Sequence, residues 1–514
     1  MASWLKNAVF YEVYPQSFYD GNGDGIGDLP GLCEKLDYIH DMGFTAIWLN
    51  PVFDSPFRDA GYDVRDYRKV APRYGTNDDL MTVFQKAHER HMHVILDLVP
   101  GHTSEEHPWF LESRKAERNA FSDRYIWTDS WFHTCPGYLS VGGEAERDGT
   151  YLLSFFKCQP ALNYGFLHPT ESWQTAADAP AALETREAIK DVMRFWLDRG
   201  CDGFRVDMAD SLVKFDDEKK SGTSAVWQDI RRMLDRDYPE AVLVAEWCRP
   251  DLSLKAGFDA DFYLDHDGNG YQSLLRDCYN GEDRSFFRRD ARNRDIGRFL
   301  NEYLPWLQEP GYVALITGNH DTPRMARTLS PREMKLYFAF LMTMPGVPFC
   351  YYGDEIGMRY LSLPTKEGGY TRTGSRSSRS PMQWNDGRNC GFSTASPERL
   401  YLPVDPAEDA PNAAQQREDP DSLLSCVRKL IQLRRKTSDL QADGGMEVVS
   451  AQKDMLAYRR GAYLMAVNPT GHAREMTLEE NWKAVFAIGN VEWENGICRL
   501  GPQSFGVGKV SGVL

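Results

Sequence analysis

Short apolar runs alternate with longer amphipathic stretches along most of the chain. The runs are rich in β-branched and aromatic residues, and each is followed by a loop and a helical pattern. The clear runs are Ala8–Tyr14, Ala46–Leu49, His93–Val99, Gly203–Met208, Ala241–Trp247, Tyr312–Thr317 and Val347–Tyr352. The helical stretches include Asn77–Met92 and Glu184–Arg199, with apolar residues three and four positions apart. Strands that alternate with helices predict a parallel sheet with helices outside it.

A weaker apolar run at Phe258–Leu264 completes the eight strands that a closed barrel needs. We therefore predict an α/β fold, a (β/α)8 TIM barrel formed by residues 1–102 and 167–440. Residues 103–166, after the third strand, are too long and too rich in aromatic residues, Gly and Pro for a simple connection, so they predict an inserted subdomain. Two β-like runs within Met455–Val467 predict that residues 441–514 form a C-terminal all-β domain, a β-sandwich.

Composition narrows the class of protein. The 514 residues are 42% hydrophobic, and 59 Lys and Arg against 75 Asp and Glu give a net charge of −16. Nucleic acids and anionic membranes attract clustered positive charge, so we expect neither as a partner. The N-terminus has no signal-peptide pattern, and no apolar run reaches the ~18 residues of a membrane span. Ten cysteines without a CxxC pair are typical of reduced thiols, so we expect a cytoplasmic protein. We also expect a monomer or small homo-oligomer.

Acidic residues stand at the ends of several predicted strands. Asp97 closes the third strand, Asp207 the fourth and Glu246 the fifth, while Asp321 follows the seventh. Because the carboxyl ends of barrel strands meet on one rim, we expect these side chains to lie together. Two acidic groups that flank a glycosidic bond, about 5–5.5 Å apart in retaining enzymes, are what glycoside hydrolysis requires. The sequence therefore predicts a glycosidase site.

Neighbouring residues add to this prediction. Arg205 shares a strand face with Asp207 and is expected to keep the pKa of Asp207 low, as a nucleophile requires. Glu246 stands beside Trp247, an apolar setting that suits a general acid. His102 and His320 follow strand ends and can bind sugar hydroxyls. As zinc ligands they would lack tetrahedral companions at suitable spacing.

Several of these segments together resemble the signature regions of the α-amylase family, glycoside hydrolase family 13. They are Asp97…His102, Gly203–Asp207, Glu246 and Asn319–Asp321, with further matches at Gly61–Val64, Gln159–Asn163 and Arg379–Trp384. The resemblance covers essentially the whole chain from about Trp4. It is closest to the branch that contains oligo-1,6-glucosidases, α-glucosidases and trehalose synthases.

The resemblance implies a role for each matching residue. Asp207 would be the nucleophile, Glu246 the acid/base, and Asp321 would stabilise the transition state. The implied substrate-binding residues are Tyr62, Asp63, His102, Arg205, His320, Arg324 and Arg379. Because Asp63 and Arg379 match residues that grip a terminal glucose, we expect a closed pocket. We therefore expect an exo-acting, retaining α-glucosidase, which cleaves α-linked glucose oligosaccharides or disaccharides through a covalent glycosyl-Asp207 intermediate.

An Asp- and Gly-rich loop follows the first strand. Its alternating oxygen side chains resemble an EF-hand loop, without the Glu at the twelfth position. Relatives in the same branch bind calcium at the matching positions, here Asp20, Asn22, Asp24, the carbonyl of Ile26 and Asp28. We expect one structural Ca²⁺ and no organic cofactor. Gly101 replaces an Asn that amylases use for another calcium, so we expect that second site to be absent.

Alternatives stay open at this point. Arg388–Ser393 and Glu398–Pro403 are similar to trehalose synthases, so a transglycosylase or isomerase is one alternative, and an endo-acting α-amylase is another. A non-catalytic binding subunit is disfavoured because all three catalytic acids are present. Lys366, Arg372 and Arg376 could serve a phosphorylated sugar. Ala161 replaces the acid that the family usually has in the Gln159–Asn163 motif. Met208, directly after Asp207, departs from the residues that the family ties to α-1,4 or α-1,6 preference and leaves the linkage open.

Overall fold

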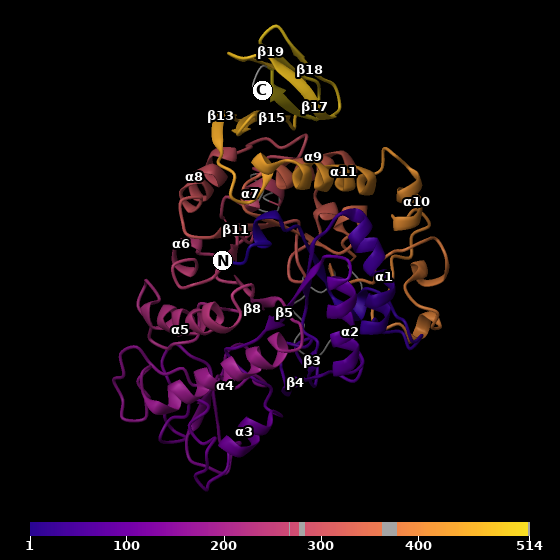
Figure 1. The fold of residues 1–514 in the computed structure, drawn as a ribbon. Helices are drawn as coiled ribbons and strands as arrows, with labels where there is room; N and C mark the ends of the chain where they lie inside the picture. Colours follow the sequence, from indigo (N-terminus) through magenta and orange to yellow (C-terminus); the bar gives the residue numbers. More distant parts are fainter. Residues whose placement is uncertain (267, 277–282, 362–377, 512–514) are drawn as a thin grey trace.

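The computed structural model describes residues 1–266, 268–276, 283–361 and 378–511. Eight parallel strands close a barrel in the order β1-β12-β11-β10-β9-β8-β5-β2, surrounded by helices (Figure 1). The strands are β1 (Phe10–Val13), β2 (Ala46–Leu49), β5 (His93–Leu98), β8 (Gly203–Val206), β9 (Val242–Ala245), β10 (Ala260–Phe262), β11 (Tyr312–Ile316) and β12 (Val347–Tyr351). All eight lie within the predicted apolar runs, so the predicted TIM barrel is confirmed.

Several of the helices outside the barrel begin at side-chain caps. They are α1 (Leu29–Met42), α2 (Asn77–His88), α4 (Pro180–Leu197), α5 (Ser221–Asp237), α8 (Ile296–Trp306), α9 (Pro331–Thr343) and α11 (Leu423–Lys436), with the short α6 (Pro250–Ser253), α7 (Gln272–Leu275) and α10 (Ala413–Glu418). Asp28 caps α1, and Thr76 with Asp79 forms a capping box on α2. Helix α2 ends before the predicted Met92, because His91 adopts a left-handed backbone (φ 55°) that turns the chain into β5.

The barrel interior has an aromatic layer beneath a polar one. The rings of Phe10, Trp48, Phe262 and Phe349 pack against one another with centroids 4.2–6.2 Å apart. Strand alternation puts Glu12 on the same face of β1 as Phe10, whereas the Tyr11 hydroxyl donates outward to Glu355 at 2.8 Å. The polar layer therefore lies at the carboxyl ends of the strands, above an apolar floor.

Two further regions lie at opposite ends of the molecule (Figure 1). Residues 103–166 carry α3 (Pro108–Ser113) and the hairpin of β6 (Ser140–Gly142) and β7 (Thr150–Leu152), with a small buried cluster around Ile126 and Phe166. A smaller hairpin, β3 (Phe53–Asp54) and β4 (Asp66–Val70), follows β2. These segments extend the rim on which the active site is expected.

The C-terminal region is all β, as predicted. Its antiparallel strands are β13 (Glu447–Gln452), β14 (Met455–Arg460), β15 (Tyr463–Asn468), β16 (Arg474–Thr477), β17 (Trp482–Ile488), β18 (Val491–Glu494), β19 (Ile497–Leu500) and β20 (Ser504–Val510). They form a five-stranded and a three-stranded sheet, with residues such as Met455 and Cys498 buried together. The predicted boundaries between the barrel, the insert and this region stay predictions.

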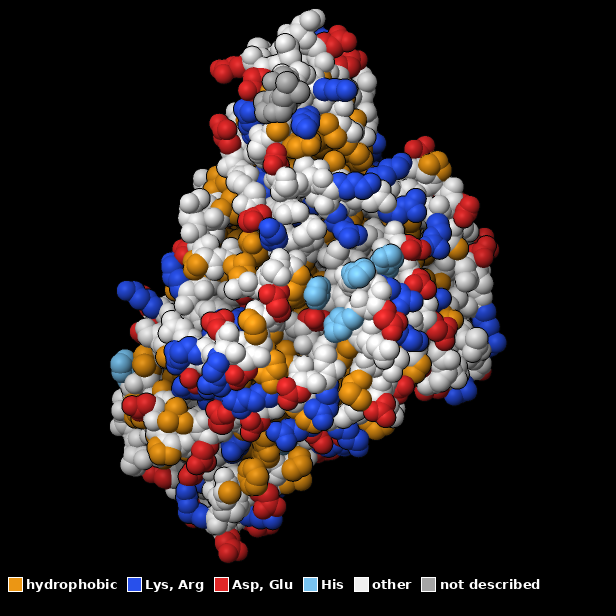
Figure 2. Space-filling view, viewed as in Figure 1, with side chains coloured by type: hydrophobic (Ala, Val, Ile, Leu, Met, Phe, Trp, Pro, Cys, Tyr) orange, Lys and Arg blue, Asp and Glu red, His pale blue; other side chains and the backbone are white. Residues whose placement is uncertain are grey.

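The surface carries mixed charge. On the face shown in Figure 2, acidic and basic side chains are interspersed. Within the described ranges, none of the helices combines the length and apolarity needed to cross a membrane. The cysteines of the described ranges are free thiols, and most of them are buried.

Candidate active site

The three predicted catalytic acids meet at one cavity. Asp207 follows β8, Glu246 follows β9, and Asp321 lies in the loop after β11. The lining of the cavity consists of Asp59, Tyr62, His102, Phe155, Phe156, Asp207, Met208, Glu246, Asp321 and Arg379. Side chains from positions far apart in the sequence therefore converge on the carboxyl rim of the barrel, as the strand-end pattern predicted.

Arg205 joins three carboxyl groups beneath this cavity. Its Nη1 lies 2.8 Å from Oδ1 of Asp97 and 3.1 Å from Oδ1 of Asp207, and its Nη2 lies 2.7 Å from Oε2 of Glu246. Arg205 is only 1% exposed, so the guanidinium acts in a medium of low dielectric. One cation thus holds the two carboxyl groups that would flank a glycosidic bond.

Crowding of carboxylates changes the ionisation of this cluster. Burial raises the pKa of Asp207 well above its usual range, and the charge of Glu246 raises it further, while Arg205 opposes the rise. The low pKa expected for Asp207 beside Arg205 is therefore corrected, because one guanidinium is shared among three carboxyl groups.

Hydrogen bonds hold both the Glu246 side chain and the loop that follows it. The amide of Met208 donates to Oε2 of Glu246 at 3.1 Å, and Met208 itself has a left-handed backbone (φ 43°). Buried Asp261 on β10 accepts hydrogen bonds from the amides of Trp247, Cys248 and Arg249, at 2.9–3.1 Å. Glu246 therefore stands between the end of β9 and a loop that Asp261 holds in place.

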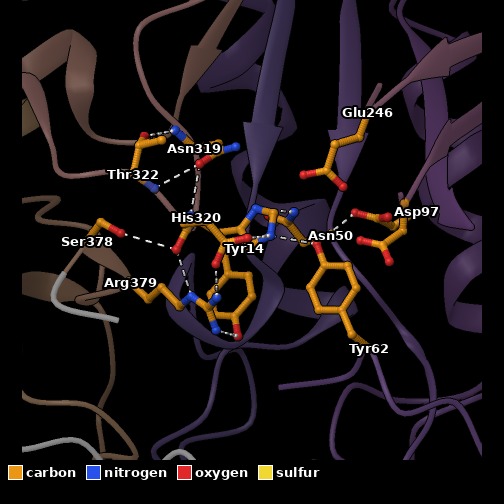
Figure 3. A network of polar contacts seen from close by, with 12 residues as sticks. Tyr14, Asn50, Tyr62, Asp97, Glu246, Asn319, His320, Thr322, Ser378 and Arg379 are labelled. Carbon is orange, nitrogen blue, oxygen red and sulfur yellow. Dashed lines mark hydrogen bonds and ion pairs between the residues drawn. The ribbon is translucent and has the colours of Figure 1, made fainter. Parts of the chain in front are cut away.

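His320 forms the other part of the site. Its Nδ1 lies 2.9 Å from Oε1 of Glu12, and its Nε2 lies 2.7 Å from the Tyr62 hydroxyl and 3.1 Å from Oδ2 of Asp321. The Tyr62 hydroxyl donates onward to Asp97 at 3.1 Å. Figure 3 shows this network, with Arg379 on one side of His320 and with Glu246 and Asp97 on the other. His320 thus connects the two sides of the cavity.

Charge is balanced around His320. Burial lowers the pKa of His320, but Asp321 and Glu12 raise it more, to about 10, so the imidazole is positive at neutral pH. Arg379 donates from Nη2 to Oδ1 of Asp321 at 2.8 Å and from Nε to the carbonyl of His320 at 2.8 Å. Burial raises the pKa of Asp321, but His320 and Arg379 hold it well below its usual range. Asp321 is therefore an ionised carboxylate facing the cavity.

His102 lines the cavity as a neutral ring. Its Nε2 lies 3.0 Å from the carbonyl of Tyr62, and burial lowers the pKa of His102 to about 4. A neutral imidazole can donate or accept a hydrogen bond with a sugar hydroxyl without adding charge to the site.

Four predicted sugar ligands are not part of the cavity lining: Arg205 and His320, which contact the catalytic acids from behind it, and Asp63 and Arg324, which do not. Asp63 is fully buried, and its carboxylate accepts from the Ser55 hydroxyl and from the amides of Arg58 and Asp59 at 2.9–3.0 Å. Arg324 is buried and donates to the carbonyl of Tyr352 at 2.8 Å and to Asp354 at 3.0 Å. Asp63 therefore stabilises the turn between β3 and β4, and Arg324 stabilises the loop after β12. This corrects their expected place in the sugar pocket.

Asp59 occupies the place expected for Asp63. It lines the cavity, and its Oδ2 accepts a hydrogen bond from Nε2 of Gln159 at 2.8 Å. Ala60 and Gly61 have left-handed backbones (φ 54° and 107°), so the chain turns between Asp59 and Tyr62. This turn directs Asp59 into the cavity. In the sequence, the turn is indicated by the small residues Ala60 and Gly61 before Tyr62.

The insert also contributes lining that the sequence did not single out. Phe155 and Phe156 follow β7 and bring two aromatic rings to the cavity. The ring of Phe155 lies edge-on to His102 with centroids 5.9 Å apart. Apolar walls of this kind bind the faces of sugar rings. Lys366, Arg372 and Arg376, considered for a phosphorylated sugar, lie outside the described residues.

The Asp- and Gly-rich loop has calcium-type donors in an internally hydrogen-bonded form. Asp20 accepts from the amide of Gly25 at 2.7 Å, and Asp28 accepts from the amide of Gly31 at 2.7 Å. The amide of Asp24 donates to the Asn22 side chain, and Asp24 in turn accepts from the amide of Ile26. Across the described ranges, no group of three or more His, Cys, Asp or Glu side chains is arranged to hold a metal. The donor types fit Ca²⁺ but their arrangement does not yet form a site, so calcium stays a prediction.

A family model for the alpha amylase catalytic domain matches residues 12–443 of this chain. The chain belongs to the α-amylase family. It is 35% identical over 511 residues to a trehalose synthase/amylase of Mycolicibacterium smegmatis, an alignment that covers 89% of this chain and 80% of the relative. It is 32% identical to a glucan 1,6-alpha-glucosidase of Streptococcus pneumoniae, with 94% of each chain covered. It is 31% identical to an oligo-1,6-glucosidase of Parageobacillus thermoglucosidasius, with 89% and 87% covered.

Solved structures agree with this assignment. The trehalulose synthase MutB of Pseudomonas mesoacidophila superposes with a TM-score of 0.81 and 28% sequence identity, with 99% of this chain and 100% of that chain covered. Within the α-amylase family, the relatives include proteins named as glucosidases and proteins named as trehalose or trehalulose synthases. The family is therefore shown, and the choice between these two activities depends on the site.

Proposed function

We propose that this α-amylase family member is a retaining, exo-acting α-glucosidase that cleaves short α-linked glucose oligosaccharides. The observation that carries the proposal is the sharing of Arg205 by Asp207 and Glu246, on a cavity that Asp321 also lines. A shared guanidinium keeps the two carboxyl groups close together. Retaining glycosidases need such closeness, at about 5–5.5 Å.

The chemistry follows from the charges. In this mechanism Asp207 attacks the anomeric carbon as its carboxylate while Glu246, in its protonated form, gives its proton to the departing glycosidic oxygen, so the C–O bond breaks as the Asp207 ester forms. Glu246, now a carboxylate, then removes a proton from a water that attacks the same carbon and frees Asp207. Asp321, ionised beside His320 and Arg379, stabilises the positive charge that develops on the sugar ring.

Exo action is favoured by two charged groups in the cavity lining. Asp59 and Arg379 both line it, and Arg379 is held to Asp321 and to the carbonyl of His320. A carboxylate and a guanidinium can bind the hydroxyls of a terminal glucose, whereas an internal glucose of a long chain would need room to continue past them. We infer that one terminal glucose fills this end.

A trehalose synthase-type isomerase is the second candidate. It uses the same glycosyl-Asp207 intermediate but returns the glucose to a sugar acceptor in place of water. The similarity to a protein named trehalose synthase/amylase favours it, as do the aromatic rings of Phe155 and Phe156, which could retain the released sugar.

Product analysis separates these candidates. The purified enzyme is incubated with maltose, isomaltose, sucrose and trehalose, and the sugars are separated by anion-exchange chromatography. Free glucose without a new disaccharide supports the α-glucosidase, and trehalose formed from maltose supports the isomerase. A maltoheptaose digest that yields maltohexaose and glucose supports exo action, and internal fragments contradict it. Absence of turnover on every α-glucoside would overturn both candidates.

A further inference from the structure

Glu12 is a buried carboxylate on the inner face of β1. It is fully buried, and its Oε1 lies 2.9 Å from Nδ1 of His320. Phe10 and Glu12 share one face of the strand, so the carboxylate stands directly above the aromatic floor of the barrel. It does not line the cavity, and therefore it cannot be the group that touches the sugar.

The carboxylate of Glu12 is costly to bury. Its second oxygen, Oε2, has no hydrogen-bond partner within the described residues. Burial raises the pKa of Glu12, and His320 only partly opposes that rise. A neutral glutamine could occupy the same space and accept the same hydrogen bond at lower cost, because burying a charge is more expensive than burying an amide. The charge therefore serves something other than folding.

We propose that Glu12 is a positioning residue that keeps His320 protonated, with its Nε2–H directed at Asp321, which lines the cavity. The inference rests on the proposed function, since it assigns His320 and Asp321 to the substrate site. Because Nδ1–H donates to Glu12, the ring orientation is fixed and Nε2–H points toward Tyr62 and Asp321.

The other charges near His320 show why a second carboxylate is needed. Asp321 attracts the imidazolium from the cavity side, and the Tyr62 hydroxyl and the Asn50 amide are neutral. Two cations disfavour the positive charge of His320. One is Arg379, which donates to the His320 carbonyl, and the other is Arg205, which pairs with Asp97, the acceptor of the Tyr62 hydroxyl. When a sugar binds, Asp321 must turn its charge to the ring. Glu12, behind the ring and away from the cavity, continues to hold the proton on His320.

The test compares Glu12→Gln with a matched control variant, Glu355→Gln. Glu355 lies after β12 and contacts the opposite face of β1 through Tyr11. Glu355 is also a fully buried carboxylate, and it accepts hydrogen bonds from Tyr11 and Tyr38 at 2.8 and 2.7 Å. With ¹⁵N-labelled histidine, the titration of His320 is followed by NMR and assigned with His320→Gln. We expect Glu12→Gln to lower the pKa of His320 by at least about one unit, as removal of a neighbouring charge does, and Glu355→Gln to leave it unchanged.

Kinetics and stability complete the design. We expect Glu12→Gln to reduce kcat about 10-fold with a smaller change in KM, and to melt at or above the temperature of the wild type. An unchanged His320 titration, an equal shift in Glu355→Gln, or a Glu12→Gln protein that does not fold would each overturn the proposal. The titration does not depend on turnover, so failure of the proposed glucosidase activity and failure of this inference are distinguishable.

Discussion

The two sides of the cavity differ in their balance of charge. Around Arg205, three carboxyl groups share one cation, and the pKa of Asp207 is raised by burial and by Glu246. Around His320, two carboxylates face two cations, and the pKa of Asp321 is held well below its usual range. The same fold thus raises the pKa of one acid of the cavity, Asp207, and lowers the pKa of another, Asp321.

This difference separates the roles of the acids. A site that must donate a proton and also form an ester needs a pair of carboxyl groups with one proton between them. A site that only stabilises positive charge needs a carboxylate that never takes up a proton. Excess negative charge on the Arg205 side and balance on the His320 side meet these two requirements, although all three acids stand on the same rim.

The largest expected effect comes from breaking the Arg205 side at its nucleophile. Asp207→Asn removes the group that forms the ester, so we expect kcat to fall by more than about 10⁴-fold. Asp321→Asn removes only charge stabilisation, for which a fall of about 10²–10³-fold is expected. Initial rates on maltose, with the far-ultraviolet circular dichroism of each variant as the control for folding, measure both. Equal losses in the two variants would contradict the division of roles.

Removal of the Arg205 guanidinium is expected to have the second largest effect. Arg205→Gln leaves Asp97, Asp207 and Glu246 without their shared cation, so we expect the free energy of unfolding to drop by about 3–5 kcal/mol. We also expect the pH–rate profile to shift to higher pH, because the carboxyl groups bind protons more tightly without the guanidinium. Urea denaturation and rates from pH 4 to 9 measure the two effects.

Arg324→Gln is the matched control, since Arg324 is equally buried and pairs with Asp354 away from the cavity. It should cost similar stability and leave the pH–rate profile in place. A profile that moves in both variants, or in neither, would count against the assignment of Arg205.

The barrel was predictable because its signal is local. Each strand is a run of apolar and β-branched residues, and such runs bury on both faces in a parallel sheet whatever their neighbours are. The end of α2 was less predictable. The apolar period continues to Met92, but the left-handed backbone of His91 is set by the turn into β5.

The site was predictable only where strand ends define it. Asp207, Glu246 and Asp321 follow strands, so the rim of the barrel collects them. Asp63 was misplaced, because the direction of its side chain depends on a turn through Ala60 and Gly61 that no periodic pattern reveals. Glu12 left a signal that was not used: a single carboxylate inside the apolar run Phe10–Val13. A charged residue in a buried strand indicates that an oppositely charged or hydrogen-bonding side chain from another part of the chain lies beside it, as His320 does here.

The His320 side can be examined through its effect on stability. The pKa of His320 is raised to about 10 from 6.5, so its protonated form stabilises the folded state fully below pH 6.5, and this contribution is lost as the pH rises through 10. We expect the difference in unfolding free energy between the wild type and His320→Gln to be largest near pH 6 and to shrink up to pH 10. Urea titrations at five pH values measure it, and a difference that is independent of pH would contradict the balance of charge.

The smallest expected effect concerns a third group of carboxylates, in the loop that follows β1. Here Asp20 and Asp28 accept hydrogen bonds from neutral donors, and burial raises the pKa of Asp28, with a further rise from Asp20. This loop resembles the Arg205 side without its cation, so an added cation should stabilise it. We expect Ca²⁺ to raise the melting temperature by about 1–4 °C relative to a chelated sample. Asp28→Asn, which keeps an N-cap acceptor for α1 and loses one charge, should abolish most of that rise, and an equal rise in both proteins would place the calcium elsewhere.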